Sequence, residues 1–265
     1  MTDAPILLEV APPYATVTLN RPDKMNAFTM DMLDALGAAF DRLDAMEDVS
    51  VVILKGAGRA FSTGMDIQAG YSPEKVGVTA DRDRLHRILN IFLRIWESPK
   101  IVIAQVHGYC CAAASMLAMS ADLIYITDDC KVRFPSLPLG GGFVSAFWTW
   151  FVGPRKAKEM DLIAGYEISG AELTELNWAN RVVAPDALED LVRTQARRIA
   201  ATPPDLLRLK KMATNRIMER QGFREAMLGG AEWDTLCHFS EGAKVIRREI
   251  NDRGLKGALD WFRSQ

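Results

Sequence analysis

Short apolar segments with strand character alternate with segments of helical periodicity along most of this chain. Residues 14–19 alternate as a half-buried strand does, and the turn at 21–23 ends them. Thr29 is then a candidate N-cap, and apolar residues recur at helical spacing up to Leu43, before a buried strand at 49–54. This β-turn-helix-β order restricts the fold class to α/β.

The same order recurs further along the chain until the strand patterns stop. It predicts helices at 85–96 and 112–119 and strands at 101–106 and 122–127. Beyond about Thr202 only helical patterns remain, at 203–220, 223–239 and 242–251, followed by a short tail. We therefore predict two parts, an α/β core at 1–200 and a helical region at 201–265.

The charge balance excludes several classes of partner. A formal net charge of −2 and a pI near 6.0 give no general attraction to nucleic acid or to an anionic membrane surface. The N-terminus lacks a basic region followed by an apolar run, and no apolar stretch is long enough to cross a bilayer. We expect a cytoplasmic protein that has neither a nucleic-acid nor a membrane partner.

Cysteine and histidine are too few and too scattered for a metal centre. The four cysteines lie at 110, 111, 130 and 237 without repeated ligand spacing or a disulfide framework, which suits a reducing compartment. The three histidines, at 86, 107 and 238, are not paired at a helical ligand spacing. We predict no metal.

Three loops combine small residues with the end of a strand, at 59–67, 108–115 and 139–143. Backbone N–H groups at such turns can hold an anion or a developing oxyanion. Tight packing of backbone against backbone is the alternative interpretation of each loop. No dinucleotide fingerprint and no P-loop is present, so those two kinds of phosphate site are excluded.

Three motifs in order carry a resemblance to a known family: LNRPDKMNAF at 19–28, AFSTGMDI at 60–67 and VHGY at 106–109. Together they resemble the crotonase superfamily of enoyl-CoA hydratases and isomerases, and the likeness continues at 121–123, 152–157 and 179–183. The resemblance implies a spiral of repeated ββα units with a C-terminal helical trimerisation domain. It also implies an acyl-CoA substrate, no permanently bound cofactor, and a homotrimer or a hexamer of two trimers.

The resemblance also implies which residues form the site. Backbone N–H groups of Met65 and Ala113 correspond to the family's oxyanion hole, and Ala113 stands where the family usually has glycine. Because one such donor contributes on the order of 3 kcal/mol of transition-state stabilisation, this pair is expected to be the largest catalytic contribution. The expected contacts to coenzyme A are Lys24, Met25, Ala27, Ala60, Ser62, Gly64, Asp66 and Ile67. An ordinary solvated lysine is the alternative for Lys24.

The sequence departs from the family at both usual catalytic glutamates, where it has Met116 and Ser136. Neither side chain is a carboxylate base, and general acid-base assistance is worth about a hundredfold to ten-thousandfold in rate. We therefore do not expect efficient crotonyl-CoA hydration. His86 and Tyr71 are candidate substitutes, and Ser136 is a candidate for orienting water or a substrate carboxylate.

Other side chains near the motifs have both a structural and a functional interpretation. His107 and Asp66 are expected to be structural. Cys111 lies near a helix N-terminus, although small buried cysteines are common. The aromatic cluster of Phe143, Phe147, Trp148, Trp150 and Phe151 either shapes a pocket for a bulky acyl group or forms core.

Three functions are compatible with these features. The leading prediction is an enoyl-CoA hydratase/isomerase-like lyase or isomerase that stabilises an enolate. A decarboxylase or ring-opening C–C hydrolase is the first alternative, because carbon–carbon cleavage generates the enolate without a base that removes a proton. The second is a CoA-thioester-binding protein that has lost catalysis.

Overall fold

The computed structural model describes residues 4–67, 72–140 and 142–265. Within them, the larger sheet has six strands in the order β1-β2-β3-β4-β6-β9. β1 and β2 pair in antiparallel fashion, and the other neighbours are parallel. The strands are β1 (Ile6–Ala11), β2 (Tyr14–Leu19), β3 (Val51–Gly56), β4 (Ile101–Val106), β6 (Leu123–Thr127) and β9 (Arg181–Val183). The predicted α/β class is confirmed.

A smaller sheet contains β5 (Tyr109–Cys111), β7 (Lys131–Arg133) and β8 (Glu167–Ser169). The chain steps from β4 to β5 at Gly108, which has φ +62 and passes the Arg59 carbonyl so closely that a Cβ would lie 2.0 Å from its oxygen. Only glycine fits both conditions. β6 and β7 repeat this step between the sheets, and a helical segment follows each pair, as in a spiral of ββα units.

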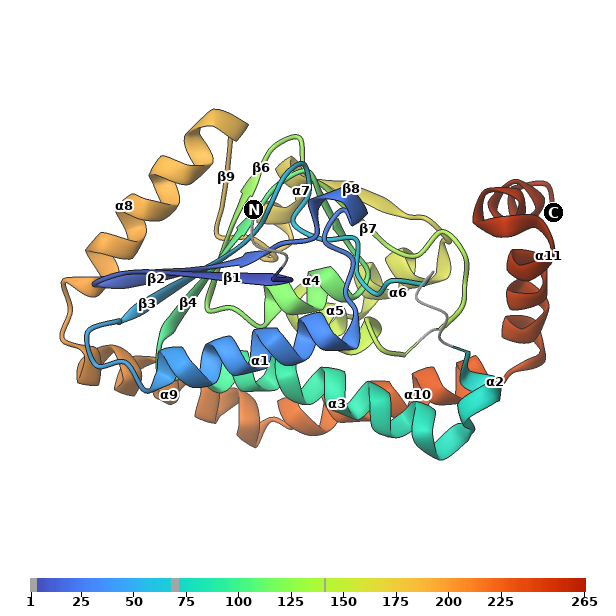
Figure 1. The fold of residues 1–265 in the computed structure, drawn as a ribbon, viewed down its shortest axis with the longest axis horizontal. Coiled ribbons are helices and arrows are strands. Elements are labelled where there is room, and N and C mark those ends of the chain that lie inside the picture. Colours follow the sequence, from blue (N-terminus) through green and yellow to red (C-terminus); the bar gives the residue numbers. More distant parts are fainter. Residues whose placement is uncertain (1–3, 68–71, 141) are drawn as a thin grey trace.

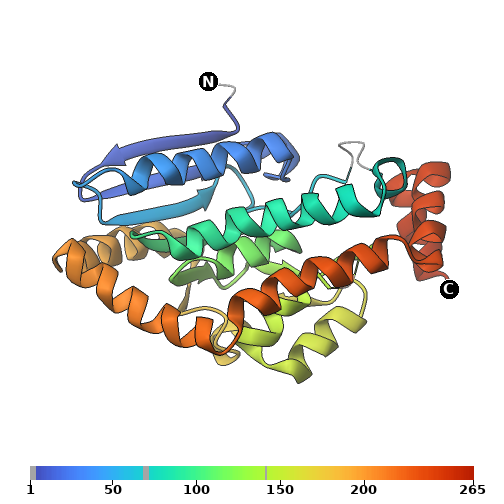
Figure 2. The same cartoon turned by 90° about the horizontal axis from the view of Figure 1, so that it is seen from below.

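Three long helices cover one face of the larger sheet: α1 (Met30–Asp44), α3 (Val78–Glu97) and α10 (Phe223–His238) (Figures 1 and 2). The predicted N-cap is confirmed, because the Thr29 hydroxyl accepts the Met32 N–H at 3.3 Å. α8 (Leu188–Ala200) covers the opposite face with an apolar stripe that packs on β3, β4 and β6. The main core therefore lies between the larger sheet and α1, α3 and α10.

Shorter helices fill the space around the smaller sheet: α4 (Ala113–Met119), α5 (Ser145–Val152), α6 (Pro154–Leu162) and α7 (Gly170–Glu175). Every residue of α4 is buried. Trp148 of α5 is buried, stacks on Trp178 at a centroid distance of 5.6 Å and donates its indole N–H to Ser115 of α4 at 2.9 Å. These contacts fix the segment that follows β5.

The chain is helical from α9 (Pro204–Arg220) through α10 to α11 (Glu241–Arg263). Lys211 of α9 reaches the Asp122 carboxylate at 2.8 Å, and Phe223 and Met227 of α10 belong to the main core. The prediction of a short tail after 251 is wrong, because Gly254 (φ +68) bends α11 instead of ending it. The segment beyond the bend packs its apolar residues near Leu139.

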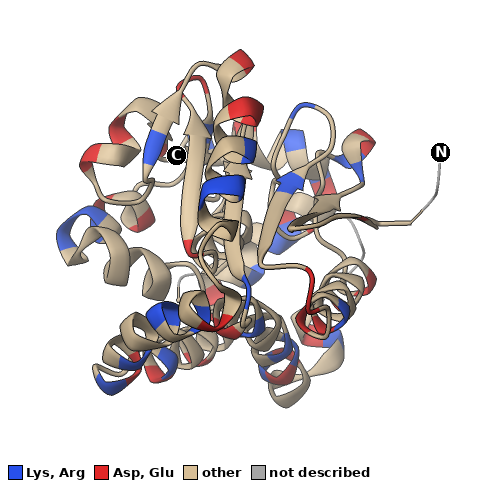
Figure 3. Cartoon of the chain, turned by 90° about the vertical axis from the view of Figure 1, so that its left-hand side faces the viewer, with Lys and Arg blue, Asp and Glu red and all other residues tan. Residues whose placement is uncertain are grey.

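The predicted element boundaries also differ at α3, which begins at Val78 and not at 85. Its first turns include Asp81, which is fully buried against α10 and so breaks the apolar pattern. No helix of the described residues combines the length and apolar character needed to cross a membrane. Figure 3 shows basic and acidic residues interspersed over this side of the molecule.

Candidate active site

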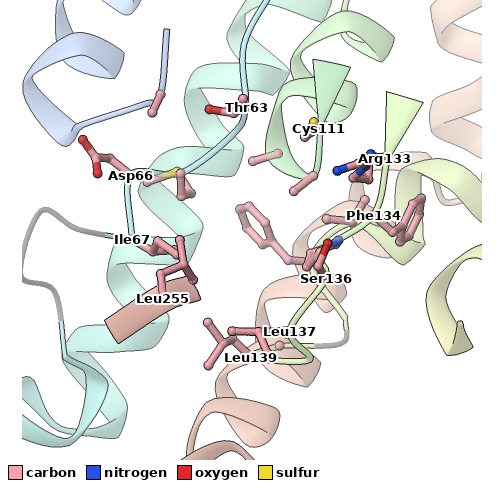
Figure 4. A pocket seen from close by; sticks show the side chains of 18 of the residues that line it. Thr63, Asp66, Ile67, Cys111, Arg133, Phe134, Ser136, Leu137, Leu139 and Leu255 are labelled. Carbon is pink, nitrogen blue, oxygen red and sulfur yellow. The ribbon is translucent and has the colours of Figure 1, made fainter. Parts of the chain in front are cut away.

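A cavity of about 590 Å³ opens beside the predicted motifs, a size typical of small-molecule sites. It lies between the loop after β3 and the segment 133–139, and Leu255 of α11 borders it (Figure 4). Most of its lining is apolar. The lining includes Lys24, Met25, Ala27, Arg59, Thr63, Met65, Asp66, Ile67, Cys111, Ala113, Phe134, Ser136, Leu137, Leu139, Phe143, Asp161, Asp234, His238, Leu255 and Leu259.

Asn26 joins the first two sequence motifs. Its side-chain amide donates to the carbonyls of Ala57 and Ala60, both at 2.8 Å, and its Oδ1 accepts the Arg21 N–H at 2.9 Å. Ser62 donates its hydroxyl to the Asn26 carbonyl at 2.8 Å and accepts the Gly64 N–H. Asn26 is fully buried at φ +55, a conformation that asparagine tolerates better than most residues.

Backbone hydrogen bonds on either side of Met65 hold its loop against Phe28. Phe28 donates its N–H to the Gly64 carbonyl at 2.8 Å and accepts the Asp66 N–H at 3.0 Å. Since neighbouring backbone groups of a bridged strand alternate in direction, the N–H of Met65 between them points away from Phe28. Met65 itself lines the cavity.

Ala113 brings a second N–H close to the same loop. It is the first residue of α4, so its N–H has no acceptor one helical turn earlier. A Cβ built on Gly64 would lie 3.2 Å from the Ala113 nitrogen and 2.8 Å from the Cys111 carbonyl oxygen. Gly64, at φ +82, therefore lets the Met65 loop pass directly against the beginning of α4.

The predicted coenzyme A contacts divide into two groups. Lys24, Met25, Ala27, Asp66 and Ile67 line the cavity, whereas Ala60, Ser62 and Gly64 are buried behind it and shape the loop. Asp66 is structural as expected, since its carboxylate pairs with the Arg21 guanidinium at 3.1 Å. Arg59 also lines the cavity, and the sequence analysis did not select it.

Met116 and Ser136, which the resemblance aligns with the family's catalytic glutamates, have different surroundings. Met116 is fully buried in the main core and is not among the described residues that line the cavity. Ser136 does line it, with Gly165 packed so that a Cβ there would lie 3.2 Å from the Ser136 hydroxyl. Among the described lining residues there is no glutamate, and the carboxylates are those of Asp23, Asp66, Asp161 and Asp234.

Of the other predicted acid-base candidates, only His86 can be compared with this lining. The His86 Nε2 is 2.9 Å from a Glu232 carboxylate oxygen, and His86 is not among the described residues around the cavity. Tyr71 lies outside the described residues. His107 is hydrogen-bonded, with Nε2 2.9 Å from the Gly58 carbonyl oxygen, as its structural interpretation predicts.

Cys111 lines the cavity but is not an activated nucleophile. Burial raises the pKa of its thiol to about 11, and the nearby Arg133 charge only partly opposes this. The neutral thiol therefore dominates at neutral pH, and a thiolate is the reactive form. The four cysteines are all free. No three His, Cys, Asp or Glu side chains within the described ranges are arranged to hold a metal ion.

The third predicted loop is explained by packing. A Cβ on Gly142 would lie 2.3 Å from the Trp233 Cβ and 2.8 Å from the Gly230 carbonyl oxygen, so the loop lies directly on α10. Of the aromatic cluster, Phe143 lines the cavity, Phe147 and Trp148 are fully buried, and Trp150 and Phe151 pack edge-on against Phe223. The cluster is therefore mainly core.

Polar cavity residues far from the motifs were also not predicted as site residues, among them Asp161 on α6, and Asp234 and His238 on α10. The spacing of Asp234 and His238, four residues apart on one predicted helix, was the available signal. Nothing in the sequence near Asp161 indicated that α6 would bring it to the same cavity. These residues lie far from the motifs along the chain.

Comparison with known proteins agrees with the fold and the motifs. The family model for enoyl-CoA hydratase/isomerase matches residues 13–231. An enoyl-CoA hydratase/isomerase from Xanthobacter autotrophicus Py2 has a crystal structure that superposes with a TM-score of 0.90 at 35% identity, covering 98% of this chain and 97% of its own.

Relatives from two further organisms extend this agreement. The Mycobacterium tuberculosis protein EchA13 is 35% identical over 84% of this chain and 77% of its own length. The short-chain-enoyl-CoA hydratase of Clostridium acetobutylicum is 28% identical over 91% of this chain and 96% of its own. The chain therefore belongs to the enoyl-CoA hydratase/isomerase family of the crotonase superfamily and is an enoyl-CoA hydratase/isomerase-like enzyme that acts on acyl-CoA thioesters.

Proposed function

We propose that the enzyme stabilises the enolate of an acyl-CoA thioester between the backbone N–H groups of Met65 and Ala113. The observation that carries this proposal is the contact of the Met65 loop with the beginning of α4 at Gly64, beside one cavity. Two donors aimed at one carbonyl oxygen stabilise the charge that develops there. Lys24, Met25, Ala27, Asp66 and Ile67 would border the coenzyme A part of the substrate, with Ala60, Ser62 and Gly64 supporting them.

The reaction class that the cavity favours is carbon–carbon cleavage, by decarboxylation or ring opening. The specific observation is that Met116 is buried in the core and that the described cavity lining contains no glutamate. Hydration in this family uses the two glutamates to activate water, whereas cleavage of a bond next to the α-carbon leaves its electron pair on the enolate directly. Ser136 would then orient water or a substrate carboxylate.

Turnover of an acyl-CoA panel by purified protein, followed by mass spectrometry, tests this function. The panel contains crotonyl-CoA, cyclic β-keto acyl-CoAs and malonyl-type acyl-CoAs, and heat-killed protein is the blank. We expect activity on the last two groups and little on crotonyl-CoA. Crotonyl-CoA turnover at ordinary enzyme rates would contradict the proposed role of the missing glutamates. Binding of CoA without any turnover would favour the non-catalytic alternative.

A pair of variants at one position tests the oxyanion donor itself. Met65→Pro removes the N–H and is expected to lower kcat by about a hundredfold to a thousandfold, the usual cost of one donor. Met65→Ala keeps the N–H and is the matched control, so it should stay within about tenfold of wild type. Equal activity of the two variants, both folded by circular dichroism, would exclude this donor.

We also propose that residues 201–265 form the oligomerisation region of a homotrimer or of a hexamer of two trimers. The support is an unusual exposure of large apolar side chains on α9 and α10. Leu209 and Ile217 of α9 are 60% and 61% exposed, and Trp233 and Leu236 of α10 are 66% and 62% exposed. A cytoplasmic location stays a prediction, which the four free cysteines support.

A further inference from the structure

Two carboxylates from different helices, Asp161 and Asp234, line the same cavity. Asp161, the penultimate residue of α6, accepts a hydrogen bond from the Ser145 hydroxyl of α5 at 2.7 Å. Asp234 of α10 accepts the N–H groups of Gly142 and Phe143 at 3.2 and 3.4 Å. Both aspartates line the cavity, and they are close enough for the charge of one to act on the other.

His238 connects Asp234 to a third carboxylate behind the wall. Its Nε2 lies 3.4 Å from Asp234 Oδ2, and its Nδ1 lies 2.8 Å from Asp81 Oδ2 on α3. The Asp81 side chain is fully buried and that of His238 is only 15% exposed. Attachment of α3 to α10 explains Asp81 and His238, but it does not explain why a second carboxylate, that of Asp161, lines the same cavity within range of the Asp234 charge.

The environments of Asp161 and Asp234 differ in a way that suits proton transfer. Burial raises the pKa of Asp161, the Ser145 hydrogen bond lowers it, and the negative charge of Asp234 raises it further, so that the net change is upward. Asp234, in contrast, faces two backbone N–H groups and an imidazole that compensate its charge. Pairs of carboxylates with contrasting environments commonly divide the roles of proton carrier and electrostatic partner.

We propose that Asp161 exchanges a proton with the acyl group of the bound thioester, and that Asp234 and His238 position and tune it. This inference rests on the proposed enolate chemistry. In one direction, an α-carbon C–H bond breaks, its proton forms an O–H bond on the Asp161 carboxylate, and its electron pair moves into the enolate. In the other, protonated Asp161 gives its proton to the α-carbon of an enolate formed by carbon–carbon cleavage.

The test measures this proton exchange separately from net turnover. Wild-type protein is incubated in D₂O with butyryl-CoA and phenylacetyl-CoA, and mass spectrometry follows deuterium incorporation at the α-carbon. Asp161→Asn preserves the shape of the side chain and should lower the exchange rate at least about a hundredfold, the usual value of a general base. Glu159→Gln, an exposed change on the same helix, is the matched control and should exchange like wild type.

A pH profile separates tuning from a merely structural role. Ser145 of α5 and Asp234 of α10 act directly on Asp161, and the Cys237 thiol of α10 lies within range of its charge. His238 of α10 acts on Asp161 through Asp234. The exchange rate should rise with pH as Asp161 loses its proton. Asp234→Asn removes a charge that raises the pKa of Asp161, so the midpoint of the profile should move to lower pH. His238→Asn removes one of the groups that compensate the Asp234 charge and should move the midpoint to higher pH.

Each outcome decides between this inference and the function on which it rests. Undiminished exchange in folded Asp161→Asn overturns the role of Asp161 and leaves the enolate chemistry intact. If the pH profiles of the exchange rate in Asp234→Asn and His238→Asn coincide with that of the wild type, Asp234 and His238 do not tune Asp161. Wild-type protein that turns over members of the acyl-CoA panel without any exchange overturns the inference alone. Wild-type protein that shows neither exchange nor turnover overturns both this inference and the proposed function.

Discussion

At the scale of single residues, the ionised carboxylate of Asp161 lowers the stability of the fold, because burying its charge costs free energy. An aspartate in the unfolded chain has a pKa of about 3.9, and the pKa of Asp161 in the fold is higher. At a pH between these two values, the Asp161 carboxyl holds a proton in the native state that it has lost in the unfolded state. Stability therefore falls as pH rises through this interval. The whole deficit is present above the raised pKa, where the native side chain is ionised.

Replacing Asp161 by asparagine should consequently stabilise the protein at neutral pH. Because the side chain is only partly buried, solvent reduces the effect, and we expect Asp161→Asn to raise Tm by about 1–2 °C at pH 7.5. The gain should be much smaller near pH 3.5, where the side chain is mostly protonated in both states of the wild type. Calorimetry at the two pH values checks this, with exposed Asp260→Asn as control. A lower Tm for the variant at pH 7.5 would contradict it.

Whether a site residue could be predicted depends on whether its role involves neighbours in a short motif or residues far away along the chain. Met65 and Ala113, the proposed oxyanion donors, lie in or close to short motifs, so the resemblance to the family implied both positions. Asp161 and Asp81 act only because α6 and α3 carry them to the same part of α10. An isolated aspartate on a helical pattern is normally a solvated side chain, and no spacing rule distinguishes these two.

At the scale of elements, the bend of α11 determines how the C-terminal segment borders the cavity. Leu255 and Leu259, directly after the bend, both line it. Gly254 has φ +68, and a Cβ built there has no neighbour within 4 Å, so a side chain meets only a conformational penalty. For an L-residue that penalty is roughly 1–2 kcal/mol. The bend therefore requires glycine because of its positive φ, and not because neighbouring atoms leave no room for a side chain.

Two glycine-to-alanine changes within α11 separate the bend from general helix stability. Gly254→Ala should loosen the segment after the bend, raise the KM for acyl-CoA several-fold and leave kcat nearly unchanged. Gly242→Ala, which also has open space but no positive φ, is the matched control and should stabilise α11 by about 0.5–1 kcal/mol. Hydrogen exchange of 255–263 and steady-state kinetics measure both. An unchanged KM with faster exchange at 255–263 would show that this segment does not contribute to binding.

The predictability of the elements follows from their length. Strands of five or six residues, such as β3 and β4, carry enough apolar pattern to be predicted, and both are confirmed. β5, β7 and β8 have three residues each, too few for any periodicity, so the smaller sheet could not be predicted from pattern. The resemblance to the crotonase superfamily, and not the hydrophobic pattern, implied the spiral.

At the scale of the whole molecule, α10 connects the cavity to the proposed subunit interface. Its inner face carries Asp234 and His238, with side chains 9% and 15% exposed. Its outer face carries Trp233 and Leu236, with 66% and 62% exposure. Large apolar side chains gathered on one face usually mark an interaction surface. A subunit that packs there would also hold Asp234 in place, because Asp234 is the next residue after Trp233.

This arrangement predicts that assembly and activity are lost together. Trp233→Glu combined with Leu236→Glu places two charges on the outer face and should convert the proposed trimer or hexamer to monomer, measured by sedimentation velocity. Turnover should fall at least about tenfold, because α10 then loses the support that positions Asp234. Val10→Glu, at an exposed apolar position on β1, is the control and should leave both assembly and turnover unchanged. A double variant that keeps its wild-type mass would place the interface elsewhere, and a fully active monomer would separate assembly from the geometry of the cavity.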